Sequence, residues 1–206
     1  LNNQPTEATT YYAQFRPMDL EVVDWQSATM VVRSTATDIA AVDFQVAGGE
    51  KQVNNQLSDC LIDNPGVYAL AFDKSELYDH QGGKLALTCY DRQGNPIGIY
   101  TLPIPVLVDG ENSSSTLPLS SEQDVWVLEG GLLTVDGSVE VHDLYVSGGG
   151  KLVVQDGNQL VTNRLVLRSG RLNSDGSYSF CSPQLVANGS IRSFGSKVEY
   201  EYLVSD

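Results

Sequence analysis

An internal repeat of about 20 residues is the feature of this chain that most limits its possible folds. In the C-terminal part the turn pair Asp-Gly occurs three times and Phe-Gly takes the fourth place, with spacings of 20, 19 and 19 residues: Asp136-Gly137, Asp156-Gly157, Asp175-Gly176 and Phe194-Gly195. A glycine and an apolar residue precede each pair: Gly131 and Leu133, Gly150 and Leu152, Gly170 and Leu172, Gly189 and Ile191. Such a repeat indicates stacked units, because one unit alone cannot bury its own apolar face.

Two further apolar rows keep the same period. One contains Val125/Val127, Leu144/Val146, Leu165/Leu167 and Leu185/Ala187, and the other contains Val139/Val141, Leu160, Tyr178/Phe180 and Val198/Tyr200. Three rows fit three short strands per repeat, each with alternate side chains pointing inward, and with glycines at the sharp turns. The sequence therefore predicts a short parallel β-solenoid of about four coils over residues 125–206.

The repeated pattern GGxLxVxxG resembles the repeats in β-helical passengers of bacterial autotransporters and in related surface adhesins. The resemblance spans about 80 residues. It implies a parallel β-helix and an exported bacterial protein, at the cell surface or in the periplasm.

The N-terminal half has a different rhythm. After a polar tail at residues 1–16, alternating segments begin near residues 18, 29, 41, 68, 84 and 96, separated by turn residues. The segment CYDRQGNPIG predicts a short hairpin, and the strand spacing resembles immunoglobulin-like and fibronectin-type modules. We therefore expect an all-β chain with an immunoglobulin-like β-sandwich at 17–109 and a linker at 110–124, followed by the solenoid. The resemblance implies a scaffold or spacer.

Charge and hydropathy exclude several partners. The chain of 206 residues carries a net charge of −14, which repels phosphate backbones, so we expect no nucleic-acid binding. Its apolar runs are short and alternating, so we expect no membrane insertion of this chain. The first residue is Leu1 and a polar run follows, as in an exported chain from which a targeting segment has been removed.

Metal and cofactor motifs are missing from the sequence. The three cysteines have no metal-ligand spacing, and free buried thiols are favoured over a disulfide between Cys60 and Cys89. The Asp-Gly aspartates Asp136, Asp156 and Asp175 suggest either a calcium ladder or ordinary turn chemistry, and we favour the second. His142 is expected to point outward, and no motif marks a nucleophile beside it. We predict neither a metal site, nor a cofactor, nor catalytic residues.

One apolar row is expected on the outside of the solenoid. Its members are Trp126, Tyr145, Val166 and Val186, at positions where a solvated strand carries polar residues. Either the N-terminal domain, the linker or a chain terminus covers this row, or it is a binding face with Trp126 and Tyr145 as stacking platforms. A weaker basic strip places Lys151 and Arg171 one coil apart, where they would attract anionic glycans unless they are simply solvated.

These observations favour a non-catalytic scaffold, adhesin-like or glycan-binding, whose partner is a glycan or a surface protein. A polysaccharide-active β-helix enzyme and a structural subunit that assembles end to end are the alternatives. The alternating charges of Lys197, Glu199 and Glu201 are expected to protect the last strand, which predicts a monomer.

Overall fold

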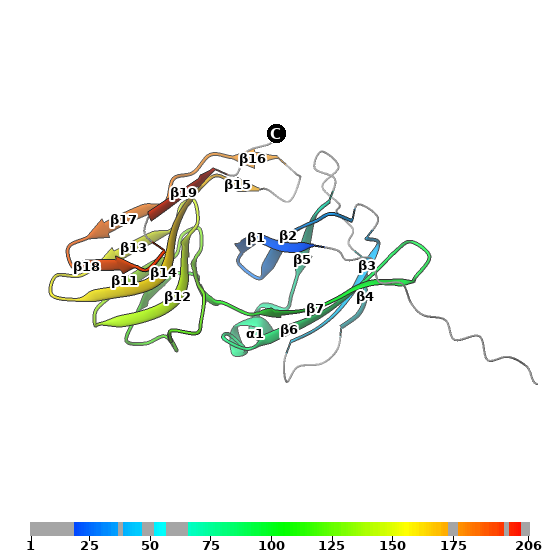
Figure 1. The fold of residues 1–206 in the computed structure, drawn as a ribbon, viewed down its shortest axis with the longest axis horizontal. Coiled ribbons are helices and arrows are strands. Elements are labelled where there is room, and N and C mark those ends of the chain that lie inside the picture. Colours follow the sequence, from blue (N-terminus) through cyan, green and yellow to red (C-terminus); the bar gives the residue numbers. More distant parts are fainter. Residues whose placement is uncertain are drawn as a thin grey trace, which may run out of the picture.

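The computed structural model describes residues 19–36, 39–46, 52–56, 66–172, 177–195 and 198–202. These residues form nineteen strands and one short helix, so the all-β prediction is confirmed. Figure 1 shows antiparallel strands at one end of the molecule and parallel strands at the other. We call residues 19–103 the antiparallel region and residues 106–202 the parallel region.

The antiparallel region consists of two sheets. The first has the order β1-β2-β5, formed by Leu20–Gln26, Thr29–Ser34 and Val67–Ala71. The second has the order β4-β3-β6-β7, formed by Gln52–Gln56, Ala41–Val46, Lys84–Tyr90 and Pro96–Pro103. Six of these strands coincide with the alternating segments of the sequence, and β6 and β7 form the predicted hairpin. Strand β4 and helix α1 (Lys74–Asp79) were not predicted.

The inward side chains of both antiparallel sheets form one core. Large members such as Trp25, Met30, Phe44, Tyr68 and Leu85 are all at least 95% buried. Cys89 belongs to this core, and burial raises the pKa of its free thiol to about 11. Cys60 lies outside the described residues. Cys181 is half-buried and also free.

The parallel region is built from two parallel sheets. One has the order β18-β14-β12-β10-β8, with β19 also pairing with β14. The other has the order β17-β13-β11-β9. In chain order the strands are β8 (Val106–Val108), β9 (Glu111–Ser113), β10 (Val125–Val127), β11 (Leu132–Val135), β12 (Val139–Val146), β13 (Lys151–Val154), β14 (Gln159–Ser169), β17 (Gln184–Ala187), β18 (Ser190–Ser193) and β19 (Val198–Tyr202).

The first two repeats stack as the sequence indicated. Val125 lies opposite Leu144 and Leu144 opposite Leu165, while Leu133 lies opposite Leu152. All five side chains are fully or almost fully buried in a second core cluster. The parallel pairing also begins earlier than the pattern indicated, because β8 pairs with β10 and β9 pairs with β11. Strand β9 therefore lies in the segment 110–124, for which a linker was expected.

The third repeat departs from the prediction. After β14 the chain turns at Gly170, which has a φ of +91°, and forms an antiparallel hairpin of β15 (Arg171–Leu172) and β16 (Tyr178–Ser179). The parallel pairing resumes only at β17, where Leu185 takes the place opposite Leu152 that we had assigned to Leu172. Ile191 then lies opposite Leu160, and Val198 opposite Leu165. The Asp-Gly pairs therefore keep their spacing in the sequence, but the pairing of the parallel strands no longer follows that spacing.

Glycines at the coil corners are required by close packing. A Cβ atom on Gly131 would lie 2.2 Å from the carbonyl oxygen of Val108, and one on Gly150 would lie 2.7 Å from that of Val127. Any larger residue there would push successive coils apart. In the part of the chain that the structure covers, no helix is long and apolar enough to cross a membrane.

Candidate functional site

The predicted outer row exists for three of its four members. Trp126 lies opposite Tyr145, and Tyr145 lies opposite Val166. Leu107 precedes them in the same row, on β8. Val186 does not belong to the row: it lies on β17 in the other parallel sheet, opposite Val153. The hairpin β15–β16 shifts the repeat and causes this error, so the interface row is defined here as Leu107, Trp126, Tyr145 and Val166.

The antiparallel region covers Leu107, Trp126 and Tyr145 of the interface row. Leu107 and Trp126 belong to the same core cluster as Trp25 and Phe72, and Tyr145 packs against that cluster. The side chains of Trp126 and Val166 are 4% and 0% exposed. The rings of Trp126 and Tyr145 stack at 4.3 Å with an angle of 14° between their planes. Of the two interpretations of this row, burial under other parts of the chain therefore describes the structure, and neither Trp126 nor Val166 presents a free face to a ligand.

Arg168 lies at the edge of this interface. Its guanidinium carbon lies 4.9 Å from the ring centroid of Trp126 and 5.5 Å from that of Tyr145. The same group forms an ion pair with Glu201 and donates a hydrogen bond to the backbone oxygen of Val23 on β1. Arg168 is 6% exposed, so these interactions are only weakly screened by solvent. No local pattern in the sequence marks Arg168, because its partners Val23 and Glu201 are distant in the chain.

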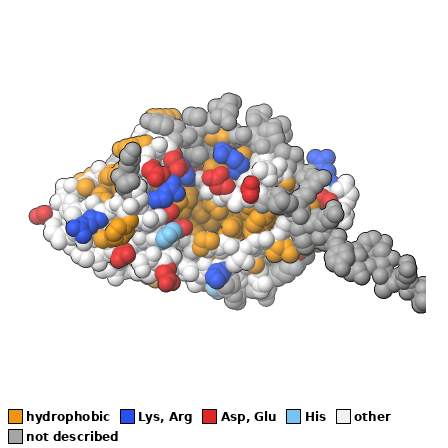
Figure 2. Space-filling model, viewed as in Figure 1, with side chains coloured by type: hydrophobic (Ala, Val, Ile, Leu, Met, Phe, Trp, Pro, Cys, Tyr) orange, Lys and Arg blue, Asp and Glu red, His pale blue; other side chains and the backbone are white. Residues whose placement is uncertain are grey.

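The buried carboxyl group of Asp24 lies at the same interface. Its Oδ1 atom is 4.0 Å from the guanidinium of Arg168, and the side chain is 4% exposed. Burial raises the pKa of Asp24, and the positive charge of Arg168 opposes that change. The register of β1 and β2 shifts between Val22 and Asp24, as in a β-bulge, and places Asp24 opposite Val31. Figure 2 shows hydrophobic side chains in the middle of one face of the molecule, with acidic and basic side chains beside them.

The predicted basic strip is not formed. Lys151 on β13 lies between Leu132 and Gln184 in the parallel sheet. Arg171 lies on the inserted hairpin and pairs with Glu129. The two residues are therefore not equivalent positions of successive coils, since the chain leaves the parallel sheet just before Arg171.

The Asp-Gly aspartates also do not form a straight ladder. Because Val135 lies opposite Val154, Asp136 follows on a level with Gln155 rather than with Asp156. Both carboxylate oxygens of Asp136 accept hydrogen bonds from hydroxyl groups, those of Ser113, Ser114 and Ser115, at 2.5 to 2.8 Å. These hydrogen bonds hold the pKa of Asp136 far below its usual range, and the bond from Ser113 has the largest effect. Asp175 lies outside the described residues.

We expect calcium to leave the stability of the protein unchanged. The carboxylate of Asp136 already has hydroxyl partners, and Asp156 is not stacked on it. The measurement is the melting temperature in calcium chloride and in EDTA. A calcium-dependent rise would contradict this interpretation, because a ligand that binds the native state must stabilise it.

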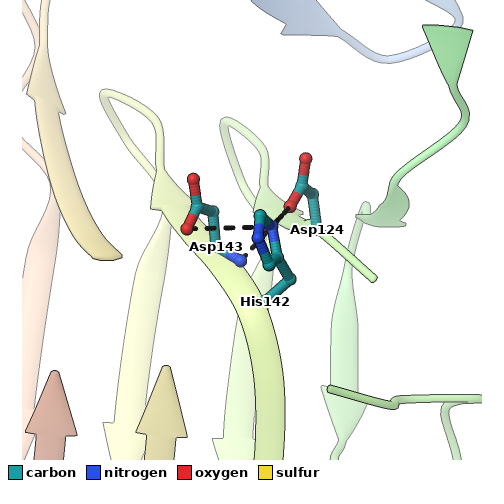
Figure 3. A group of neighbouring side chains, drawn as sticks. All are labelled: Asp124, His142 and Asp143. Carbon is teal, nitrogen blue, oxygen red and sulfur yellow. Dashed lines mark hydrogen bonds and ion pairs between the residues drawn. The ribbon is translucent and has the colours of Figure 1, made fainter. Parts of the chain in front are cut away.

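Among the described residues, a histidine and two aspartates place their side-chain ligand atoms close enough together to hold a metal ion (Figure 3). Asp124 precedes β10, whereas His142 and Asp143 are neighbours on β12. The Nδ1 atom of His142 lies 2.7 Å from Oδ1 of Asp124 and 3.8 Å from Oδ1 of Asp143. Oδ1 of Asp124 also accepts a hydrogen bond from the backbone nitrogen of Asp143, at 3.2 Å. Sequence reasoning had placed His142 on the outside, where its side chain is indeed half-exposed.

The residues around Asp124, His142 and Asp143 indicate an ion-pair network rather than a metal site. Asp143 accepts a hydrogen bond from the side-chain amide of Asn163 at 2.9 Å and lies 3.8 Å from the guanidinium of Arg164. Arg164 in turn pairs with Glu199 at 2.6 Å. Three ligand atoms within 4.8 Å are enough to offer a place to a metal ion. The guanidinium of Arg164 already neutralises part of the charge that would attract one.

His142 should make a small part of the stability depend on pH. The hydrogen bond that Nδ1 of His142 donates to the carboxylate of Asp124 raises the pKa of His142 above its ordinary value of 6.5. The stabilisation is therefore fully present below about pH 6.5 and is lost as the pH rises through the higher folded-state pKa. Because the imidazole is half-exposed, the expected contribution is less than about 1 kcal/mol. The pKa of His142 can be measured by NMR titration. Asp124→Asn should lower it, and an unchanged value would show that Asp124 is not the cause.

Comparison with protein-family models, with curated proteins and with solved structures finds no match for this chain.

Proposed function

We propose that this chain is a non-catalytic scaffold module of an exported bacterial protein. In this proposal residues 17–109 are an immunoglobulin-like β-sandwich and the parallel region is a short β-solenoid. The strand orders β1-β2-β5 and β4-β3-β6-β7 around one core support the first assignment. The stacked parallel pairs of β8 to β14 support the second. The resemblance of these repeats to those of bacterial surface adhesins supports the proposal that the protein is exported.

Burial of the interface row is the observation that carries the scaffold role. Trp126 and Leu107 lie in a core cluster whose other members come mostly from the antiparallel region, so the two regions share apolar packing as well as a chain connection. Domains that are joined by a large apolar interface do not move freely against each other. A rigid two-part module is suited to holding surfaces at a fixed spacing.

The test is whether the two regions unfold together. Unfolding in guanidinium chloride should be followed by NMR signals of Val42 in the antiparallel region and of Leu152 in the parallel region. We expect coincident transitions, as for one cooperative unit. Two separated transitions would show that the regions are independent, and the rigid-scaffold role would be wrong.

Two further measurements separate this proposal from its alternatives. A panel of polysaccharides incubated with the protein should yield no shortened product, whereas an enzyme would release one. Light scattering should give the same mass at all protein concentrations, whereas a subunit that assembles end to end would grow with concentration.

A further inference from the structure

A cavity of about 490 Å³ lies between the sheet β1-β2-β5 and the parallel region. The antiparallel region contributes residues around the β1–β2 turn, and the parallel region contributes the coil corners next to Leu128, Ser147 and Gly170. This volume falls within the range of pockets that hold small organic ligands. The cavity is separate from the group formed by Asp124, His142 and Asp143.

Several residues that line this cavity have a buried polar atom without a hydrogen-bond partner. In the part of the chain that the structure describes, four buried side-chain polar atoms have no hydrogen-bond partner, and three of them belong to residues that line the cavity: Oδ1 of Asp24, Oγ of Ser147 and Nε of Arg171. Asp24 and Ser147 are 3% and 7% exposed. Buried polar groups are normally satisfied, so a cluster of unsatisfied ones indicates a place for a hydrogen-bonding ligand.

The charges around the cavity favour a neutral ligand. Its two basic lining residues are both paired, Lys74 with Asp109 at 2.6 Å and Arg171 with Glu129. An anion would therefore have to displace a carboxylate. The remaining carboxyl group, Asp24, lies beside Arg168, and burial raises its pKa, which weakens its attraction for a cation.

The mixture of polar groups fits a ligand with several hydroxyl groups. Asp24 offers an acceptor, Arg171 offers a donor, and the hydroxyl of Ser147 serves as either. A sugar hydroxyl likewise both donates and accepts. Apolar side chains share the lining, among them Trp25, Val31 and Leu128, and these suit the C–H faces of a sugar ring. The turn at Ser27 adds another hydroxyl at the cavity and has a φ of +54°, a strained value of the kind that gathers at functional sites.

We propose that this cavity is a binding site for a neutral sugar, a monosaccharide or one residue of a glycan, held by Asp24, Ser147 and Arg171. Sugar binding is an additional function, and the proposed scaffold role does not depend on it. This site also differs from the stacking platform expected at Trp126 and Tyr145.

The experiment uses the full chain and probes that share a ring but differ in charge. Glucose, galactose, mannose and N-acetylglucosamine are the neutral probes, glucuronate is the anion and glucosamine the cation. Binding is followed by ligand-observed NMR and by tryptophan fluorescence. We expect at least one neutral sugar to bind saturably, and more tightly than both charged probes.

Two variants locate the binding. Ser147→Ala should weaken the binding at least tenfold, and Ala69→Leu, which places a larger side chain in the cavity lining, should abolish it without lowering the melting temperature. The control is Ser169→Ala, because Ser169 is equally buried, at 7% exposed, and does not line the cavity. The proposal is overturned if no neutral sugar binds, if a charged probe binds more tightly, or if both variants bind like wild type. The first outcome would mean that only water fills the cavity.

Discussion

Leu152→Asp should unfold the parallel region. Leu152 is fully buried on β13, between Leu133 on β11 and Leu185 on β17. A carboxylate at this position would lie in the second core cluster with no cation among its members. Burying an unpaired charge costs several kcal/mol at least, which is comparable with a total stability of roughly 5–15 kcal/mol. Far-UV circular dichroism and the melting temperature measure the effect.

The matched control is the next residue along the strand. Val153 points to the other face of the same sheet and is only half-buried. Val153→Asp should therefore keep the fold and melt close to wild type. If Leu152→Asp also melted like wild type, the assignment of Leu152 to the interior would be wrong.

Trp126→Ala should destabilise the interface between the two regions by about 3–5 kcal/mol, the usual loss for truncating a buried large aromatic side chain. The substitution removes the ring that stacks on Tyr145 and faces Arg168, and it leaves a gap in the shared core. The coincident unfolding transitions of the two regions should then separate. Chemical denaturation with a probe in each region measures both effects.

Tyr145→Phe is the control for this prediction. It keeps the stacked ring and removes a hydroxyl whose nearest partner, Asp143, is 3.5 Å away. The expected cost is at most about 1 kcal/mol, with coincident transitions retained. Equal effects of the two substitutions would show that the stacked ring pair is not what joins the regions.

The sequence predicted the parallel strands wherever the repeat is regular. Val125, Leu144 and Leu165 occur at nearly equal spacing, and inward and outward positions alternate, so each register follows from the period alone. The prediction failed at Leu172 and Val186, because the sequence of residues 171–179 contains apolar residues and an Asp-Gly pair that continue the apparent period, while the chain forms an inserted hairpin there. Strand β9 was missed since Asn112, which stacks on Leu133, is not apolar, and β8 was assigned to the end of the sandwich at 17–109.

The candidate sites were less predictable than the fold. The apolar outer row was evident from Trp126 and Tyr145, but which surface covers it depends on contacts between distant parts of the chain. The cavity residues Asp24 and Ser147 are more than 120 residues apart, and no local pattern connects them. Asp24 turns toward the interface only because the register of β1 shifts beside it, and neither its neighbours nor its hydropathy signals that shift.

The position of β8 has a consequence for the order in which the protein folds during synthesis. Strand β8 follows β7 after only Ile104 and Pro105, and its Leu107 is anchored in the core of the antiparallel region. The ribosome therefore completes that region, with the first parallel strand already attached, before any later coil emerges. Each new strand from β10 onward meets an edge whose register is already set. The antiparallel region thus acts as a template, which spares the parallel strands the slow search for a first partner.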